Sequence, residues 1–221
     1  MLKTENNIYN LPYNDLKEYL CFIEHIFDEI EFDMQIYKDF NNARITQQIK
    51  PNYFISWCIR NYYKSLVLNL CKLLEPRKDD KNKFTLTHFI DLLKYEPNLQ
   101  TLKEEFKQKT IKHYDIRTGE TEEENVEHIY LEQLNNINFD NDAKEIEKIH
   151  RKIKDFRNKK LAHNDKKYDG TKLLPSVNEL HNDVQKIELI FKTYFSLFGI
   201  GVNYDGFKSP NFYGNFQLNL R

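Results

Sequence analysis

Hydrophobic residues recur every three or four positions along most of the chain, which is the spacing of amphipathic helices. From Asn14 to about Gln48 the steps alternate between four and three residues, at Leu16, Leu20, Ile23, Phe27, Ile30, Met34 and Tyr37. Pro51 ends this pattern, and a second helix is expected from Asn52 to Leu74, with Phe54, Cys58, Tyr62, Leu66 and Leu70 on one face. The pattern therefore predicts two long helices in the first third of the chain.

The middle of the chain is less regular. Two shorter helical patterns cover residues 86–93 and 99–106, with Pro97 between them. Between residues 107 and 124 the helical period is lost and Gly119 marks a turn, so a surface loop or a small hairpin is expected there. This segment is the mid-chain insertion of the predicted fold.

Helical spacing returns in the second half of the chain, starting near Asn125. After the polar stretch 135–142, Asp140 or Asn141 is expected to cap a longer helix, whose apolar stripe is Ile146, Ile149, Ile153 and Phe156. The last helix is the most apolar. Ser176 and Glu179 predict a capping box at its start, and the glycines at 199 and 201 are expected to end it.

Together these patterns predict an all-α fold, a helical bundle of about four long helices with one mid-chain insertion. The whole chain of 221 residues is expected to form a single domain, with a helical core over residues 14–198 and an irregular tail over residues 199–221. Only six glycines and six prolines occur, and this scarcity of turn-forming residues favours long helices over many short strands.

Composition narrows the class of protein. The formal net charge is −1, so the chain as a whole is not a basic nucleic-acid binder. Cys21, Cys58 and Cys71 lack metal-ligand spacing and are expected to be reduced and partly buried. No apolar run approaches the roughly 20 residues needed to span a membrane, and the first residues lack the apolar centre of a signal peptide. A cytoplasmic protein without membrane contact is therefore expected.

Charge is nevertheless unevenly distributed. Residues 120–147 contain ten acidic side chains and one basic one, whereas residues 148–172 contain ten basic side chains and three acidic ones. A local positive field of this kind attracts phosphates even on a neutral protein. Within this basic block, Lys159, Lys160 and Lys166 are candidate contacts to the RNA backbone.

The basic block contains the strongest candidate for chemistry, the stretch "RNKKLAH", with Arg157, Asn158 and His163. Arginine holds a phosphate with a planar, permanently charged fork, and histidine takes or gives a proton near neutral pH. These groups suffice to cleave RNA without a metal or another cofactor, because the ribose 2′-hydroxyl supplies the nucleophile. Along a straight helix, however, six residues correspond to about 9 Å of rise and about 240° of rotation. The helix could end before His163 so that the chain folds back, two copies could pool their residues across a two-fold axis, or both could hold at once.

The motif and its placement resemble the HEPN family of α-helical nucleases. The signature of that family is an arginine, a polar residue that is often asparagine, and a histidine after four to six intervening residues, which Arg157, Asn158 and His163 match. The stretch over residues 69–93 also resembles the HEPN domains of bacterial abortive-infection proteins. The resemblance implies a homodimeric, metal-independent endoribonuclease that acts as a toxin in antiphage or toxin–antitoxin defence, with a possible antitoxin or other defence-system partner protein.

The resemblance does not extend to a tyrosine two residues after the histidine, where this chain has Asp165. Some HEPN proteins are inactive, so a non-catalytic helical module that binds RNA or protein within a defence complex remains the alternative.

Two other patterns bear on function. Glu147 and His150 have the Glu-x-x-His spacing of di-iron bundles, but no second such pair occurs in the chain. The aromatic residues Trp57, Tyr62 and Tyr63 could stack on bases, although core packing is the more common use of such residues.

Overall fold

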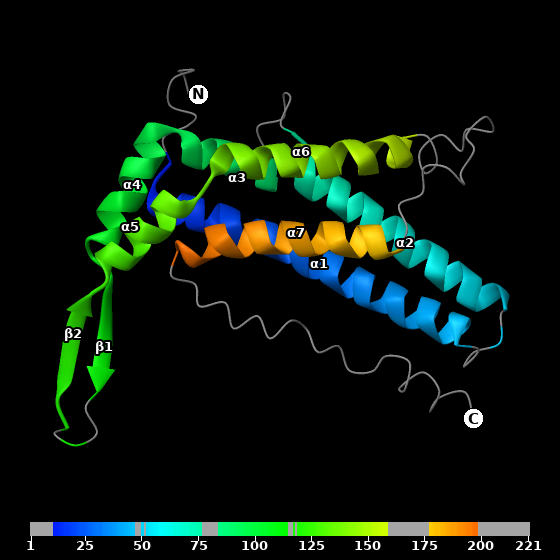
Figure 1. Ribbon diagram of the computed structural model, residues 1–221, viewed down its shortest axis with the longest axis horizontal. Coiled ribbons are helices and arrows are strands. Elements are labelled where there is room, and N and C mark those ends of the chain that lie inside the picture. Colours follow the sequence, from blue (N-terminus) through cyan, green and yellow to red (C-terminus); the bar gives the residue numbers. More distant parts are fainter. Residues whose placement is uncertain are drawn as a thin grey trace, which may run out of the picture.

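The computed structural model describes residues 11–46, 50, 52–76, 84–114, 117, 119–158 and 177–198. Over this part of the chain it contains seven helices and one two-stranded sheet, which confirms the predicted all-α class (Figure 1). The elements in order are α1 (Tyr13–Ile45), α2 (Tyr53–Leu74), α3 (Leu86–Lys94), α4 (Glu96–Phe106), β1 (Thr110–Tyr114), β2 (Thr121–Asn125), α5 (Glu127–Asn136), α6 (Phe139–Phe156) and α7 (Val177–Ser196).

Helices α1 and α2 form a long antiparallel pair, and both start close to the positions that the hydrophobic pattern predicts. Asn52 caps α2, because its side chain accepts a hydrogen bond of 2.8 Å from the backbone N–H of Ile55. Helix α7 packs along α1, and α6 packs on both α2 and α7. The C-terminal end of α6 points toward the end of the molecule where α1 meets α2 (Figure 1).

The core lies where the helices face one another. The predicted stripe of α1 is buried, and residues of α6 and α7 complete the same cluster, including Ile146, Ile149, Ile153 and Phe191. The rings of Phe27 and Phe191 stack with their centroids 5.4 Å apart, which joins α1 to α7. Each such side chain contributes about 1.5–3 kcal/mol when fully buried, so the bundle is stabilised mainly by its apolar faces.

The mid-chain insertion is a β-hairpin, as the loss of helical period predicted. Strand β1 pairs with β2 in antiparallel register, and Gly119 adopts a φ of +75° in the connection. The hairpin extends away from the helices beside α4 and α5 (Figure 1), and all the side chains of β2 are exposed. Lys112 and Glu123 form an ion pair of 2.9 Å across the two strands.

The structure corrects the predicted start of α6. Neither Asp140 nor Asn141 is the N-cap; instead the side chain of Asn138 accepts a hydrogen bond of 3.0 Å from the N–H of Asn141. Asp140 is the second residue of the helix and pairs with Lys94 of α3 at 2.5 Å. Residues 138–142 contain four capping-type side chains, so pattern alone could not choose among them.

Other predictions fall partly beyond the described residues. Ser176 of the expected capping box and the tail over residues 199–221 lie outside them. The three cysteines are free thiols; Cys58 and Cys71 are buried as expected, whereas Cys21 is exposed. Among the helices described here, none combines the length and apolar character required to cross a bilayer.

Candidate functional site

Arg157 stands at the C-terminal end of α6, immediately after the last apolar turn of the helix. Its backbone N–H donates to the carbonyl oxygens of Ile153 and Lys154, so the backbone is still helical at this residue. Arg157 and Asn158 continue α6 as a wider, π-type turn. Since Ile153 is buried in the core, the end of α6 is firmly anchored where it presents the arginine.

Two oxygen atoms from different elements lie against the guanidinium of Arg157. Its Nη1 lies 3.9 Å from Oε1 of Glu75, which follows the last residue of α2, and its Nε donates a hydrogen bond of 3.1 Å to Oδ1 of Asn158. The side chains of Arg157 and Glu75 keep 26% and 31% of their surface exposed. The arginine is therefore oriented by its neighbours and still reachable from solvent.

The structure thus brings together two of the three predicted motif residues, Arg157 and Asn158. His163 lies outside the described residues, as do the candidate RNA-binding residues Lys159, Lys160 and Lys166. The placement of the histidine relative to the arginine, by a fold-back of the chain or across a two-fold axis, stays a prediction.

His150 forms part of the protein interior beneath the arginine. It lies seven residues before Arg157, which places both on the same side of α6. Its side chain is only 3% exposed, and its Nε2 is buried without a hydrogen-bond partner in the part of the chain that the structure describes. Burial lowers the pKa of His150, and the cations Lys154 and Arg157 lower it further against the opposite effect of Glu75. The imidazole is therefore neutral at pH 7.

Cys71 lies on α2 one turn before Glu75 and is also buried. Burial raises the pKa of its thiol to about 11, although the nearby cations Arg157 and Lys154 act in the opposite direction. A thiol with such a pKa is a poor nucleophile at neutral pH. His150 and Cys71, which lie on the interior side of the site, are therefore both uncharged near neutral pH.

Sequence reasoning missed both Glu75 and the position of His150. Glu75 directly precedes Pro76, and the hydrophobic pattern marks it only as the end of a helix. It lies close to Arg157 because α6 packs on α2. His150 has the spacing of a Glu-x-x-His pair with Glu147, but the two side chains lie in different surroundings. Glu147 is exposed and pairs with Arg151 at 2.5 Å, whereas His150 is buried. Within the described ranges, no group of three or more metal-ligating side chains occurs.

The basic side chains of α6 are less free to bind phosphates than the composition of the basic block suggests. On α6, Lys152 pairs with Asp183 of α7 at 2.9 Å, and Lys148 lies 3.9 Å from Glu145. Arg151 is also paired, as described above. Much of the positive charge of α6 is thus balanced by acidic neighbours before the helix reaches its last turn.

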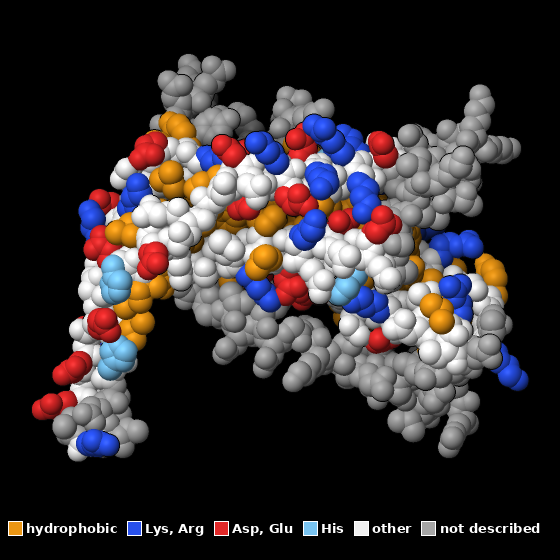
Figure 2. All heavy atoms as spheres, in the orientation of Figure 1, with side chains coloured by type: hydrophobic (Ala, Val, Ile, Leu, Met, Phe, Trp, Pro, Cys, Tyr) orange, Lys and Arg blue, Asp and Glu red, His pale blue; other side chains and the backbone are white. Residues whose placement is uncertain are grey.

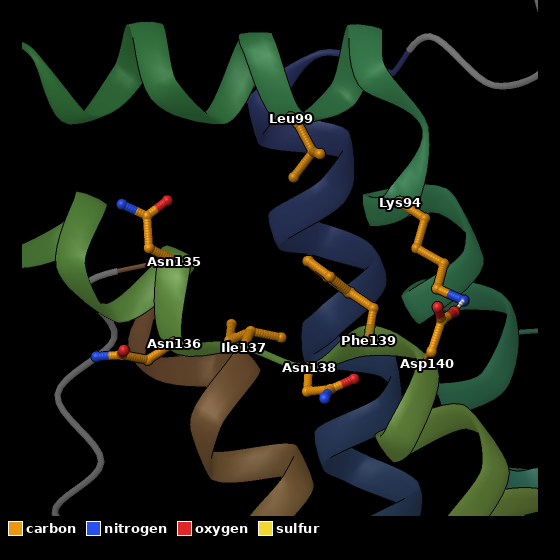
Figure 3. A pocket seen from close by; sticks show the side chains of 8 residues that line it. All are labelled: Lys94, Leu99, Asn135, Asn136, Ile137, Asn138, Phe139 and Asp140. Atoms are coloured by element: carbon orange, nitrogen blue, oxygen red, sulfur yellow. Dashed lines mark hydrogen bonds and ion pairs between the residues drawn. The ribbon is translucent and has the colours of Figure 1, made fainter.

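A separate hollow of about 690 Å³ lies at the opposite end of α6 (Figure 3). It is lined by residues 135–140 together with Lys94 and Leu99. The ion pair between Lys94 and Asp140 occupies one side of it, and three asparagine amides line much of the remainder. Because it adjoins the start of α6 and Arg157 follows its end, this hollow is not part of the predicted site.

Proteins of the HEPN class are generally ribonucleases. A family model of this class, described as AbiU2, matches residues 13–199, and the chain belongs to this HEPN family, which is associated with abortive-infection systems. Comparison with curated proteins and with solved structures gives no significant match.

Proposed function

We propose that this protein is a metal-independent endoribonuclease that acts as a toxin in bacterial antiphage or toxin–antitoxin defence. The observation that supports this best is the environment of Arg157. A permanently charged guanidinium is held between Glu75 and Asn158 at a helix end and stays partly exposed. An arginine fixed in this way can bind a phosphate group and stabilise the additional negative charge of a phosphorane.

The proposed reaction uses the substrate's own nucleophile. The ribose 2′-hydroxyl attacks the adjacent phosphorus, and the bond from phosphorus to the 5′-oxygen breaks. His163 takes the proton from the 2′-hydroxyl or gives one to the departing 5′-oxygen, while Arg157 stabilises the charge on phosphorus. Asn158 keeps the arginine oriented. The products are a 2′,3′-cyclic phosphate on one fragment and a free 5′-hydroxyl on the other.

The proposed role in defence is based on membership of a family that is associated with abortive-infection systems. In this proposal the active assembly is a homodimer. The RNA backbone binds near the end of α6, where Lys159, Lys160 and Lys166 follow the arginine in sequence. A partner protein that silences the toxin would cover this end of the helix. In growing cells the wild-type protein would slow growth, and a variant without His163 would not.

The test is incubation of the purified protein with total RNA in the presence of EDTA, followed by mass spectrometry of the fragment ends. Cleavage that survives EDTA and leaves a cyclic phosphate is the expected result. A 5′-phosphate on the downstream fragment would refute the mechanism, because water activated by a metal usually gives that end. A substrate with 2′-deoxyribose at the cleaved position should resist, although it can still bind through its phosphates. An inert protein that binds RNA or a partner would support the non-catalytic alternative.

A further inference from the structure

The end of the molecule where α1 meets α2 exposes a group of aromatic side chains. Tyr53 is 87% exposed, Trp57 52% and Phe54 49%. The rings of Phe54 and Trp57 are nearly parallel, with an interplanar angle of 19° and centroids 6.2 Å apart. Sequence reasoning favoured the core for Trp57, and that assignment is wrong: Tyr62 and Tyr63 lie half-buried against aromatic rings of α1, whereas Trp57 faces solvent.

Basic side chains flank these rings in the sequence, and acidic ones are missing from the same stretch. Residues 40–74 contain five basic side chains, Arg44, Lys50, Arg60, Lys64 and Lys72, and no acidic one. All five are exposed. Figure 2 shows lysine, arginine and hydrophobic side chains together at this end of the molecule. A surface of this composition favours an anionic partner that also offers flat apolar faces.

The exposed residues follow one side of α2 toward the candidate site. Tyr53, Trp57, Arg60, Lys64 and Leu68 recur at steps of three or four residues, so they share a side of the helix, and all are exposed. The next residues in the same series are Cys71 and Glu75. There the helix is covered by α6, and Glu75 contacts Arg157. The distance along α2 from Trp57 to Glu75 is about 27 Å.

We infer that this side of α2, defined by Tyr53, Trp57, Arg60 and Lys64 and called the α2 platform, binds single-stranded RNA by base stacking. A strand that stacks on Tyr53 and Trp57 and places its phosphates near Arg60 and Lys64 is led along α2 to Arg157. The inference rests on the proposed function for its substrate. Double-stranded RNA fits poorly, because its bases are already stacked on one another. A second copy of the chain fits poorly as well, because pairing two platforms would bring the exposed cations Arg60 and Lys64 of both copies together.

The chain offers a direct probe, because Trp57 is its one tryptophan. The experiment titrates the full chain with a short single-stranded 2′-O-methyl RNA, which lacks the 2′-hydroxyl needed for cleavage. It follows tryptophan fluorescence and the fluorescence anisotropy of the labelled strand.

Stacking of a base on Trp57 should quench the emission of this residue, and the matching duplex should not quench it. Trp57→Ala and Tyr53→Ala should each weaken binding about 5-fold to 100-fold. Trp57→Phe should retain most of the affinity. Leu189→Ala, at an apolar position of α7 that is 70% exposed, is the matched control and should bind as the wild type does.

The outcomes separate this inference from the proposed function. Unquenched Trp57, or Tyr53→Ala and Trp57→Ala variants that bind like the wild type, would overturn the platform even if the protein cleaves RNA. Quenching and loss of affinity in a protein that never cleaves RNA would uphold the platform and refute the nuclease. A platform variant that changes the oligomeric state without changing RNA affinity would assign this surface to a second copy. Binding to anionic vesicles but not to the oligonucleotide would assign it to a membrane surface, and either result would overturn the inference.

Discussion

The Nη1 atom of Arg157 lies 3.9 Å from Oε1 of Glu75, and this contact joins the C-terminal ends of α6 and α2. The separation is longer than a hydrogen bond, and both side chains are partly exposed. Such a pair contributes roughly 0–1 kcal/mol to folding. Its consequence is geometric, because the carboxylate limits the directions in which the guanidinium can point.

The Glu75→Gln variant therefore tests whether Glu75 orients Arg157 or stabilises the fold. The substitution keeps the shape of the side chain and removes its charge, so the melting temperature should change little. The rate of RNA cleavage should fall, by about 10-fold or more, because a misplaced catalytic group can cost up to roughly 10²-fold. Glu132→Gln, at an exposed position of α5, is the control and should leave the rate unchanged. Equal rates in the Glu75→Gln variant and the wild type would show that the contact does not orient Arg157.

Replacing Arg157 tests whether a positive charge at this position is sufficient for RNA cleavage. Arg157→Lys keeps a cation but loses the planar fork and the hydrogen bond from Nε to Asn158, so cleavage should drop sharply. Arg157→Ala should lower the rate by about 10²–10³-fold, the range measured for loss of one donor to a developing oxyanion. His163→Ala should lower it by about 10²–10⁴-fold. Lys17→Ala, at an exposed position of α1, is the control. Near-full activity in either alanine variant, or its failure to fold by circular dichroism, would reject the catalytic assignment.

His150 gives the fold a predictable response to acid. Its pKa in the folded protein lies below the ordinary value of 6.5, because the imidazole is buried. Above that pH the side chain is neutral in both the folded and the unfolded state. As the pH falls below 6.5, the unfolded chain takes up a proton that the folded chain resists, so the free energy of unfolding decreases.

Denaturant titrations at several pH values between 8 and 5 should therefore show a smaller loss of stability for His150→Leu than for the wild type. Nε2 has no partner within the described structure, so removing it should cost little at pH 8. His128→Gln, at an exposed position of α5, is the control and should follow the wild-type curve. If His150→Leu folds normally but no longer cleaves RNA, His150 takes part in the reaction as well.

The helices were predictable because each has one apolar side that must be buried. The stripes at Leu16–Ile30 and Ile146–Ile153 are core positions in the structure, as their spacing of three and four residues indicates. The insertion was predictable for the opposite reason, since its helical period disappears around Gly119. The cap of α6 was not, because Asn138, Asp140, Asn141 and Asp142 are all competent caps and tertiary contacts decide among them.

The candidate site was only partly predictable. A linear motif reveals residues that are close in sequence, so Arg157 and Asn158 could be found. Glu75 belongs to another helix and comes close only through the packing of α6 on α2, which sequence spacing does not encode. The exposure of Trp57 was missed for a related reason. The sequence of a helix rich in aromatic and aliphatic residues does not show where the helices that pack on it end. The first turns of α2 extend past α6 and α7.

The last prediction concerns the assembly. Arg157 and His163 would point in different directions from a straight helix, so a homodimer with its interface along residues 143–163 is expected. Light scattering should give the mass of two chains at micromolar concentration. A monomer that still cleaves RNA would refute the predicted homodimer.

Mixing inactive variants shows how the residues are shared between the two chains. If the site pools both arginines and both histidines in one cleft, a heterodimer of Arg157→Ala and His163→Ala chains retains one intact arginine and one intact histidine. Unfolding and refolding the two variants together should then restore part of the RNA cleavage, and each variant refolded alone should stay inactive. Restored activity requires residues from both chains in one site, because neither chain has both. If the co-refolded sample contains heterodimers by native mass spectrometry and remains inactive, each site belongs to a single chain, and the chain must fold back after Asn158 to bring His163 to Arg157.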